Sequence, residues 1–278
     1  MNSSCKTTRL YIPHAHDSEC KIAGDLEQVD PQVPTQGRKI ILILHGTMGH
    51  KDYLYQKRLA KALPVDSFRF DFRGAHETGG TWKMSAFDED IEDLEVVVNY
   101  LTKEYGYVID TVVSHSRASI VTFRWICTTE SGRKIRAFRI LERSDFYNSY
   151  FKAHGYYDWK VVVAQKQVVG RIYPEDLEKF ATWDTTPFKE NFPPGVHVLT
   201  IHGMQDKVVP VYDAILFSRL LGRRDTATHN LCLLEEADHN FTLHKDEVVS
   251  TILAWWSVLN RDGLKTGIWD DEIIKGRL

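Results

Sequence analysis

Four short stretches of the chain place polar side chains directly after apolar runs. They are, in chain order, HGTMG (45–49), SHSRA (114–118), HGMQDKVVP (202–210) and ADHNF (237–241). The first stretch contains two glycines. The second contains the serine Ser116, the third contains the carboxylate Asp206, and the fourth contains the histidine His239. A serine hydroxyl becomes a good nucleophile when a histidine takes its proton and a carboxylate orients that histidine. The four stretches therefore predict acyl-transfer chemistry if the fold brings them together.

The segments that must position these residues alternate between strand and helix patterns. Buried strands are expected at 40–44, 67–72, 109–113, 196–203 and 229–236, and helices at 52–63, 85–106, 118–129, 210–221 and 246–260. Ser85 is expected to cap the second helix. Such alternation predicts an α/β fold, a mostly parallel sheet with helices on both faces. Ligands bind beyond the carboxyl ends of such strands, so the four stretches should meet at one edge.

Two regions depart from this alternation. Residues 8–29 have the pattern of an antiparallel edge, and residues 144–193 interrupt the strand and helix order as an insertion over the sheet. Within the insertion, 160–173 has the pattern of a hairpin. The insertion is rich in aromatic residues, among them Phe146, Tyr147, Tyr150, Phe151, Tyr156, Tyr157, Trp159, Phe180, Trp183, Phe188 and Phe192. These side chains either pack the insertion onto the body or face a ligand, and the sequence leaves both readings open.

In their order and placement, the stretches resemble the α/β-hydrolase family, and most closely its serine esterases, which include the cinnamoyl and feruloyl esterases. The resemblance rests on ILHGTMGHKD, FRFDFRGAHETGG, HGMQDKVVP and EEADHNF. It covers nearly the whole chain and implies a single α/β-hydrolase domain over 1–278, with 144–193 as an inserted lid.

The resemblance also implies a role for each site residue. Ser116 would be the nucleophile on a strained strand-to-helix turn, and His239 would be its general base. Asp206 would orient His239 and stabilise the imidazolium. The backbone N–H groups of Thr47 and Arg117 would stabilise the oxyanion.

Several neighbours of these residues are expected to have structural roles. Asp71 and Arg73 would brace a loop near the site, and His45 and His115 would support the loops that they flank.

The nucleophile turn departs from the usual Gly-x-Ser-x-Gly pattern. The common pattern has glycine at two positions because strand and helix approach closely on either side of the serine. Ser114 and Ala118 occupy these two positions here. Both replacements are small, so the turn is expected to be tightened and still to work. A working turn and a plain strand-to-helix connection remain the two alternatives for this stretch.

A second departure concerns FRILERSD, residues 138–145. Some α/β-hydrolases place the triad acid after this strand, which makes Glu142 a rival to Asp206. Alternatively, Glu142 forms ion pairs with Arg139 and Arg143, or Arg143 contacts a substrate carboxylate. The sequence does not separate these options.

The resulting expectation is a serine hydrolase that cleaves a carboxylic ester of a small to medium substrate, with an aromatic substrate as one option; the sequence does not identify the acyl and alcohol groups. A lactonase or thioesterase would use the same residues, and a non-catalytic ligand-binding member of the fold is the alternative from another class. No cofactor is expected. The expected partner is a small-molecule ester or lactone, and the oligomeric state is not determined by the sequence.

Composition excludes several other classes. The 278 residues carry a net charge of −3, with 43% hydrophobic and 26% charged residues, which gives no basis for binding nucleic acid or an anionic membrane. The chain has no apolar run of about 18 residues and begins without the apolar core of a signal peptide. Its four cysteines have no metal or disulfide spacing, and the histidines of HAH (14–16) have no partner pair nearby. A cytoplasmic protein without a metal is expected.

Overall fold

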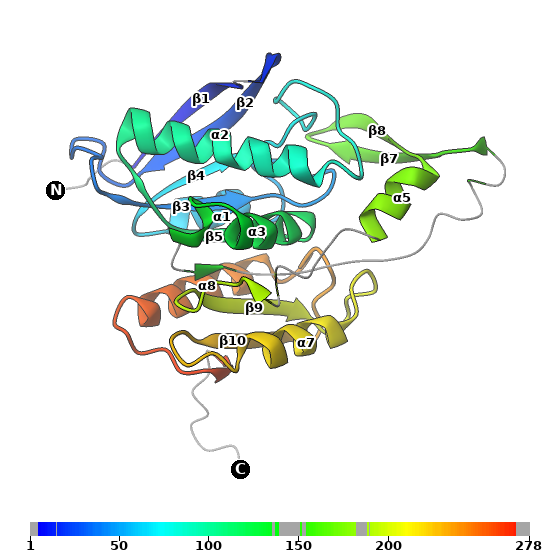
Figure 1. Ribbon diagram of the computed structural model, residues 1–278. Helices are drawn as coiled ribbons and strands as arrows, with labels where there is room; N and C mark the ends of the chain where they lie inside the picture. Colours follow the sequence, from blue (N-terminus) through cyan, green and yellow to red (C-terminus); the bar gives the residue numbers. More distant parts are fainter. Residues whose placement is uncertain are drawn as a thin grey trace.

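The computed structural model describes residues 5–14, 16–134, 137–138, 151, 154–181, 188 and 190–270. Its central feature is a nine-stranded sheet in the order β1-β2-β4-β3-β5-β6-β9-β10-β11 (Figure 1). The strands are β1 (Lys6–His14), β2 (Asp17–Gln28), β3 (Lys39–Leu44), β4 (Asp66–Phe70), β5 (Val108–Ser114), β6 (Ala137–Phe138), β9 (His197–Gly203), β10 (His229–Leu234) and β11 (Gly267–Ile268).

The sheet is parallel from β4 to β11 and antiparallel only where β1 pairs with β2 and β2 with β4. The inner strand β3, KIILIL, is buried at every position after Lys39. A strand covered on both faces needs such a continuous apolar run. The predicted fold class and the predicted antiparallel edge are therefore confirmed.

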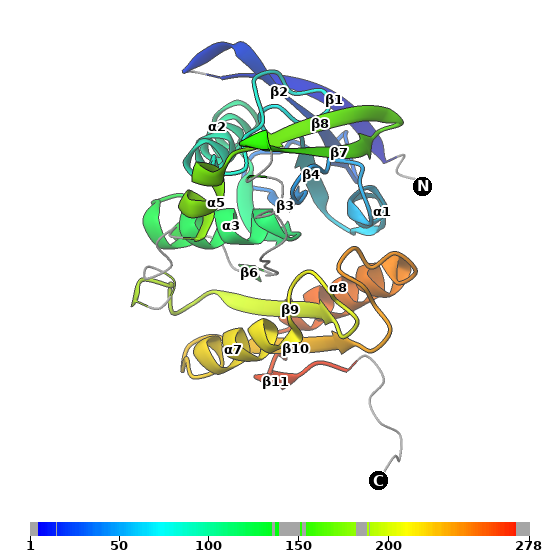
Figure 2. The same cartoon turned by 90° about the vertical axis from the view of Figure 1, so that its right-hand side faces the viewer.

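Helices cover both faces of the sheet: in Figure 2, α2 and α3 lie on the left of strands β3 and β4, and α1 lies on their right. One face carries α2 (Phe87–Tyr105), α3 (Arg117–Thr128) and α7 (Val211–Leu221), and the other carries α1 (Gln56–Ala62) and α8 (Lys245–Leu259). Helix α2 ends at Gly106, which takes the left-handed conformation (φ 71°) that glycine adopts without strain. A short 3₁₀ turn, Gly132–Lys134, follows α3.

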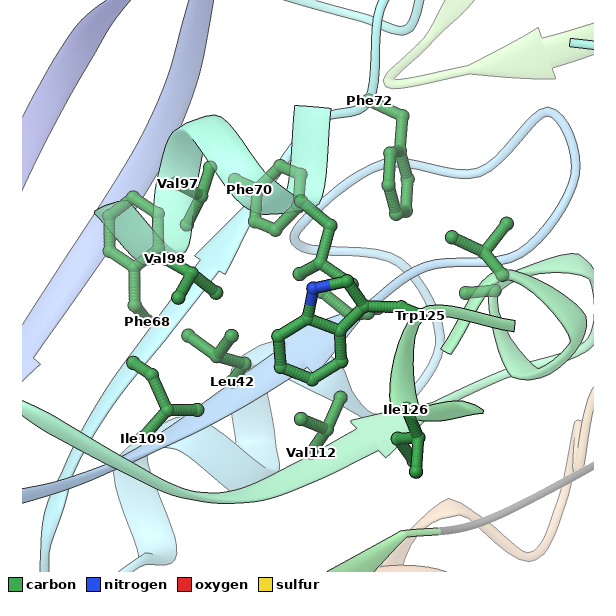
Figure 3. Packing of buried hydrophobic residues seen from close by; sticks show 14 of the residues in the cluster. Leu42, Phe68, Phe70, Phe72, Val97, Val98, Ile109, Val112, Trp125 and Ile126 are labelled. Atoms are coloured by element: carbon green, nitrogen blue, oxygen red, sulfur yellow. The ribbon is translucent and has the colours of Figure 1, made fainter. Parts of the chain in front are cut away.

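The larger core cluster lies between the sheet and the α2–α3 layer. Trp125 of α3 is fully buried there and packs among the side chains of the central strands, including Leu42, Phe70 and Val112 (Figure 3). Because this cluster holds the first turns of α3 against β5, it also fixes the connection between them, which contains Ser116.

The insertion predicted over 144–193 contains a second, two-stranded sheet. Strands β7 (Tyr157–Val163) and β8 (Lys166–Ile172) pair antiparallel, and α5 (Pro174–Ala181) follows. The predicted hairpin is confirmed. In Figure 1 the hairpin and α5 project beyond the main sheet.

The predicted cap of α2 is wrong. The helix begins after Ala86, without a side-chain cap. Ser85 Oγ instead donates to Asp176 Oδ1 of α5 across 2.6 Å. The Ser85 hydroxyl therefore bonds a residue of the insertion and does not form the cap at the N-terminus of α2 that its position in the sequence predicts.

Candidate active site

Ser116 occupies a sharp turn between β5 and α3. Its backbone angles, φ 52° and ψ −124°, lie in a region that residues other than glycine rarely adopt. The turn is held from both sides: Ala118 N–H donates to His115 O across 3.2 Å, and Ser119 N–H donates to Ser116 O across 2.8 Å. Strain of this kind persists only where the surrounding structure imposes it, and it occurs often at functional sites.

The two residues that replace the glycines of this turn are both fully buried. Ser114 Oγ lies 2.8 Å from Thr122 Oγ1, and Thr122 Oγ1 donates to Ala118 O across 2.8 Å. Because a hydroxyl has one proton, Ser114 must be the donor to Thr122. The extra hydroxyl therefore has a partner.

Three side chains from different strand ends form a continuous hydrogen-bonded chain. His239 Nε2 lies 3.0 Å from Ser116 Oγ, and His239 Nδ1 lies 2.8 Å from Asp206 Oδ2. Ser116 follows β5, Asp206 follows β9 and His239 follows β10. With Asp206 accepting from Nδ1–H, Nε2 is left as the acceptor for the serine proton.

Asp206 is buried and fully hydrogen-bonded. Its Oδ1 accepts from the backbone N–H groups of Val208 and Val209, each across 2.8 Å. Burial acts to raise the pKa of Asp206, but the hydrogen bond and charge of His239 and these two amides hold that pKa below its ordinary value. Asp206 is therefore ionised at neutral pH. His202 Nε2 donates to Val209 O across 3.1 Å and supports the same turn.

The turns that carry Asp206 and His239 pack directly on each other. A β-carbon at Gly203 would lie 2.2 Å from Ala237 O, so only glycine permits this approach. Gln205 N–H also donates to Ala237 O across 3.0 Å. The glycine of the HGMQD stretch thus brings the carboxylate within reach of the histidine.

The loop after β3 lies against Ser116. A β-carbon at Gly46 would lie 3.0 Å from the β-carbon of Ser116. His45 Nε2 accepts from Phe72 N–H across 3.0 Å, and its Nδ1 donates to Gly46 O across 2.8 Å. Burial lowers the pKa of His45 to about 4, so the ring is neutral. Because a trans peptide points its C=O and N–H in opposite directions, holding Gly46 O also fixes the direction of Thr47 N–H.

The side chain of Arg117 is bound by groups outside the Ser116–His239–Asp206 chain. Its Nε donates to Asp90 Oδ2 across 2.7 Å, an Nη donates to Met84 O, and the guanidinium lies 4.3 Å from the centre of the Phe87 ring. Burial raises the pKa of Asp90 to about 6, although Arg117 acts to lower it. The side chain of Arg117 packs around α2. Its backbone N–H belongs to the first residue of α3, directly after Ser116.

A buried ion pair braces the segment that follows the β3 loop. Lys51 donates to Asp71 through its backbone N–H (2.6 Å) and its ammonium (2.7 Å), and the ammonium also donates to Glu77. The predicted bracing role of Asp71 is confirmed. Within the described chain, Asp71, His76 and Glu77 are also the one group of three or more residues with metal-ligand atoms within 4.8 Å of one another. The Lys51 ammonium already binds both carboxylates, which argues against a cation there.

A pocket of about 310 Å³ opens over Ser116. Its lining residues are Thr47, Met48, His50, Tyr53, Met84, His115, Ser116, Arg117, Ile120, Trp159, Val161, Val162, Val163, Phe180, Val208, His239 and Asn240. The volume is at the lower end of the range for small-molecule sites, which are concave and mostly apolar with a few polar groups.

The β7–β8 hairpin supplies one wall of the pocket through Trp159 and three valines. Gly170 of β8 packs so closely on the body that a β-carbon there would lie 2.7 Å from the Trp82 ring and 3.1 Å from Met48 Sδ. The hairpin therefore rests on Met48, which is the neighbour of Thr47. A glycine within a strand pattern indicates such a close approach, and this signal was available in the sequence.

Most of the described aromatic residues of the insertion pack against protein. Phe188 and Phe192 lie 5.1 Å and 5.3 Å from Phe123, measured between ring centres. Only Trp159 and Phe180, among the insertion's described residues, combine an aromatic ring with a place in the pocket lining. Of the two readings left open by the sequence, packing accounts for the larger share.

Sequence reasoning found the residues at the centre of the site and missed several around it. Ser116, Asp206 and His239 meet, and Thr47 and Arg117 line the same pocket. Glu142, with Arg139 and Arg143, lies outside the described residues. The contributions of residues such as Thr122, Tyr53 and Met84 had no motif to mark them.

Comparisons with known proteins place the chain beside hydrolases. Residues 137–260, which contain Asp206 and His239, match the prolyl oligopeptidase family, Peptidase_S9. An uncharacterized protein of Saccharomyces cerevisiae, YDL057W, is 26% identical over an alignment of 251 residues, which takes in 76% of this chain and 71% of the yeast protein.

Solved structures extend the likeness to nearly the whole chain. Est1E of Butyrivibrio proteoclasticus, in a structure with bound ferulic acid, superposes with a TM-score of 0.68 at 16% identity, covering 89% of this chain and 98% of that chain. The Pyrococcus furiosus esterase Pf2001 gives a TM-score of 0.63 at 16% identity, covering 91% and 92%.

The chain is therefore an α/β-hydrolase by fold, and its structural neighbours include esterases, as its sequence motifs predicted. In the part of the chain that the structure describes, no helix is both long enough and apolar enough to cross a bilayer.

Proposed function

We propose that the protein is a serine hydrolase that cleaves carboxylic esters through an acyl-enzyme on Ser116. The observation that carries this proposal is the hydrogen-bonded chain from Asp206 through His239 to Ser116, with distances of 2.8 Å and 3.0 Å. A bare ligand-binding pocket has no need of an ionised carboxylate aligned on a histidine that accepts from a strained serine.

The proposed reaction follows from these contacts. Ser116 Oγ attacks the ester carbonyl while His239 Nε2 takes its proton, and Asp206 stabilises the imidazolium. The N–H groups of Thr47 and Arg117 stabilise the oxyanion of the tetrahedral intermediate. The C–O bond then breaks as His239 gives its proton to the leaving alcohol. Water, deprotonated by His239, releases the carboxylic acid and restores Ser116.

The 144–193 insertion is proposed as a lid over this site. Its hairpin and α5 supply Trp159, the valines and Phe180 to the pocket, which supports a preference for bulky apolar acyl groups. The four cysteines are free, with Cys5 exposed, which supports the proposal of a cytoplasmic location, where thiols stay reduced. Lactones and thioesters present the same carbonyl chemistry to Ser116.

A second candidate, peptide-bond hydrolysis, is favoured by the match of residues 137–260 to the prolyl oligopeptidase family. The same side chains would serve, with an amine as leaving group. Turnover of an ester and of an anilide that share one acyl group decides between them: the ester proposal requires the larger kcat/KM on the ester and activity at the anilide no better than trace.

Reaction with a fluorophosphonate followed by peptide mapping tests the main proposal. The probe is expected to label Ser116, and Ser116→Ala is expected to abolish labelling and to lower ester turnover by several orders of magnitude. Labelling of another serine, or full activity of Ser116→Ala, would contradict the assignment. A wild-type protein inert to both probe and esters would favour the ligand-binding alternative.

A further inference from the structure

The pocket over Ser116 has two walls of different chemistry. One is apolar and is formed by Met84, Trp159 and Phe180, which belong to one cluster of packed side chains beneath the hairpin. The other is polar and is formed by His50, which follows the β3 loop, by Tyr53, which precedes α1, and by Asn240, which follows β10.

The polar wall lies on the side of His239. Tyr53 and His239 line the same pocket, and burial together with the charge of Asp238, the neighbour of His239, raises the pKa of the Tyr53 hydroxyl. The two segments also meet two residues after Tyr53 and two residues after His239. There the ring centres of Tyr55 and Phe241 are 6.3 Å apart. The segment before α1 and the turn after β10 therefore pack side by side.

The polar wall has unused hydrogen-bonding capacity and no charge. Among the described residues, none bonds to the Tyr53 hydroxyl or to the side-chain amide of Asn240, and His50 accepts only at Nδ1, from Asp52 N–H across 3.4 Å. The His50 Nε2 therefore carries the ring proton, and no described residue accepts from it. Burial lowers the pKa of His50, which keeps the ring neutral at pH 7.

Catalytic geometry assigns each wall to one part of an ester. The leaving oxygen must lie within hydrogen-bond reach of His239 Nε2, because His239 supplies its proton. The alcohol then extends along the polar wall, and the acyl group is left with the apolar wall. Resting on the proposed esterase function, we infer that the substrate joins an apolar acid to a neutral alcohol with further hydroxyl groups, which His50, Tyr53 and Asn240 bind.

Two butyrate esters with the same number of alcohol carbons test this inference, the glycerol monoester and the propyl ester. The wild-type protein is expected to have the larger kcat/KM on the glycerol ester. Tyr53→Phe and Asn240→Leu should each lower the ratio of the two kcat/KM values about 3- to 10-fold, the usual size for one hydrogen bond. The matched control is Tyr212→Phe, a tyrosine on α7 that is 58% exposed and does not line the pocket, and it should leave the ratio unchanged.

Acyl transfer gives an independent readout of the same wall. With 4-nitrophenyl butyrate as donor, added glycerol should capture more of the acyl-enzyme as ester than 1-propanol at equal concentration, and Tyr53→Phe should reduce this difference. Efficient cleavage of both esters, with no preference for glycerol and no effect of Tyr53→Phe, would overturn the alcohol inference while leaving the esterase proposal intact. Failure to cleave either ester, together with no labelling of Ser116, would overturn both.

Discussion

Ser114 and Thr122 share a buried hydrogen bond of 2.8 Å that ties the last residue of β5 to the second turn of α3. Thr122 Oγ1 in turn donates a hydrogen bond to Ala118 O across 2.8 Å, so the three residues form a short hydrogen-bonded relay on both sides of Ser116 in the chain. A serine hydroxyl in this fully buried position would otherwise be left without a partner. The relay therefore explains how the turn accepts a polar side chain where glycine is usual.

Thr122→Val should lower the free energy of unfolding by about 1–3 kcal/mol, because valine keeps the shape but leaves the buried Ser114 hydroxyl unsatisfied. Urea unfolding measures this change. Thr128→Val is the matched control: Thr128 lies on the same helix and bonds Arg124 O in the same way, but it is exposed. Ser114→Ala/Thr122→Val should recover most of the loss, and a single variant as stable as wild type would contradict the relay.

Replacing both Ser114 and Ala118 by glycine should leave the fold intact and should hold or raise turnover on a simple ester. Glycine gives strand and helix room at the turn, and a shift near 1 Å at a nucleophile can change a rate about 10²-fold. Stability can change in either direction, since glycine relieves crowding but adds entropy to the unfolded chain. Steady-state kinetics on the folded variant provide the check. A folded but inactive double variant would mean that the two side chains belong to the site itself.

Asp206→Asn should lower kcat on the order of 10⁴-fold, because the asparagine cannot balance the imidazolium charge and favours the wrong tautomer of His239. Glu142→Gln should retain most of the activity. The two variants are compared by kcat at saturating ester. The opposite ranking would transfer the role of the acid to Glu142.

Gly170 should set the height of the hairpin over the pocket. Wild type is expected to have a larger kcat/KM on aryl or other bulky acyl esters than on acetate esters. Gly170→Ala must push the hairpin off Trp82, which lies 2.7 Å from the added carbon, and should lower kcat/KM on the bulky esters roughly tenfold. The clash with Trp82 should lower the melting temperature, although alanine suits a strand at least as well as glycine, so the kinetics are compared below the transition of the variant.

Val169→Ala is the control for that series, since Val169 is 52% exposed on the outer face of the same strand. It should leave the acyl preference as in wild type. Equal efficiency of the wild-type protein across acetate and aryl esters would remove the reason for a substrate-facing hairpin.

Asp93 should make the protein less stable as pH rises from about 4 to 6. Burial raises its pKa to about 6, against the opposing effect of Arg73, so the folded protein holds this proton more tightly than the unfolded chain does. The associated stability is complete below the unfolded pKa of about 3.9 and is lost as pH passes through the folded value. Asp93→Asn should reduce the drop in unfolding free energy between pH 5 and pH 7 by about 1 kcal/mol.

Urea unfolding of both proteins at the two pH values measures this difference. Asp88→Asn, an exposed position on the same helix, should leave the pH dependence unchanged. Parallel pH profiles for wild type and Asp93→Asn would show that the carboxyl does not titrate as described.

Local order in the sequence determined the sheet, the layers and the centre of the site. A β-branched and leucine run such as that of β3 is typical of a strand covered on both faces, and alternation with helices favours a parallel arrangement of such strands. Parallel strands end at one edge. The positions of Ser116, Asp206 and His239 directly after β5, β9 and β10 therefore predict that the three side chains lie close together.

Tertiary packing alone decided which partners the surrounding side chains have. Ser85 reads as a helix cap but bonds Asp176, which is 91 residues away, and Gly170 meets Trp82 and Met48 only because the hairpin folds back over the β3 loop. The polar wall likewise joins Tyr53 to the turn after β10. Sequence periodicity reports which face of an element is buried, and it carries no information on which distant element covers that face. These contacts depend on how the layers are placed against each other, and that placement is fixed by the fit of all the packed side chains together.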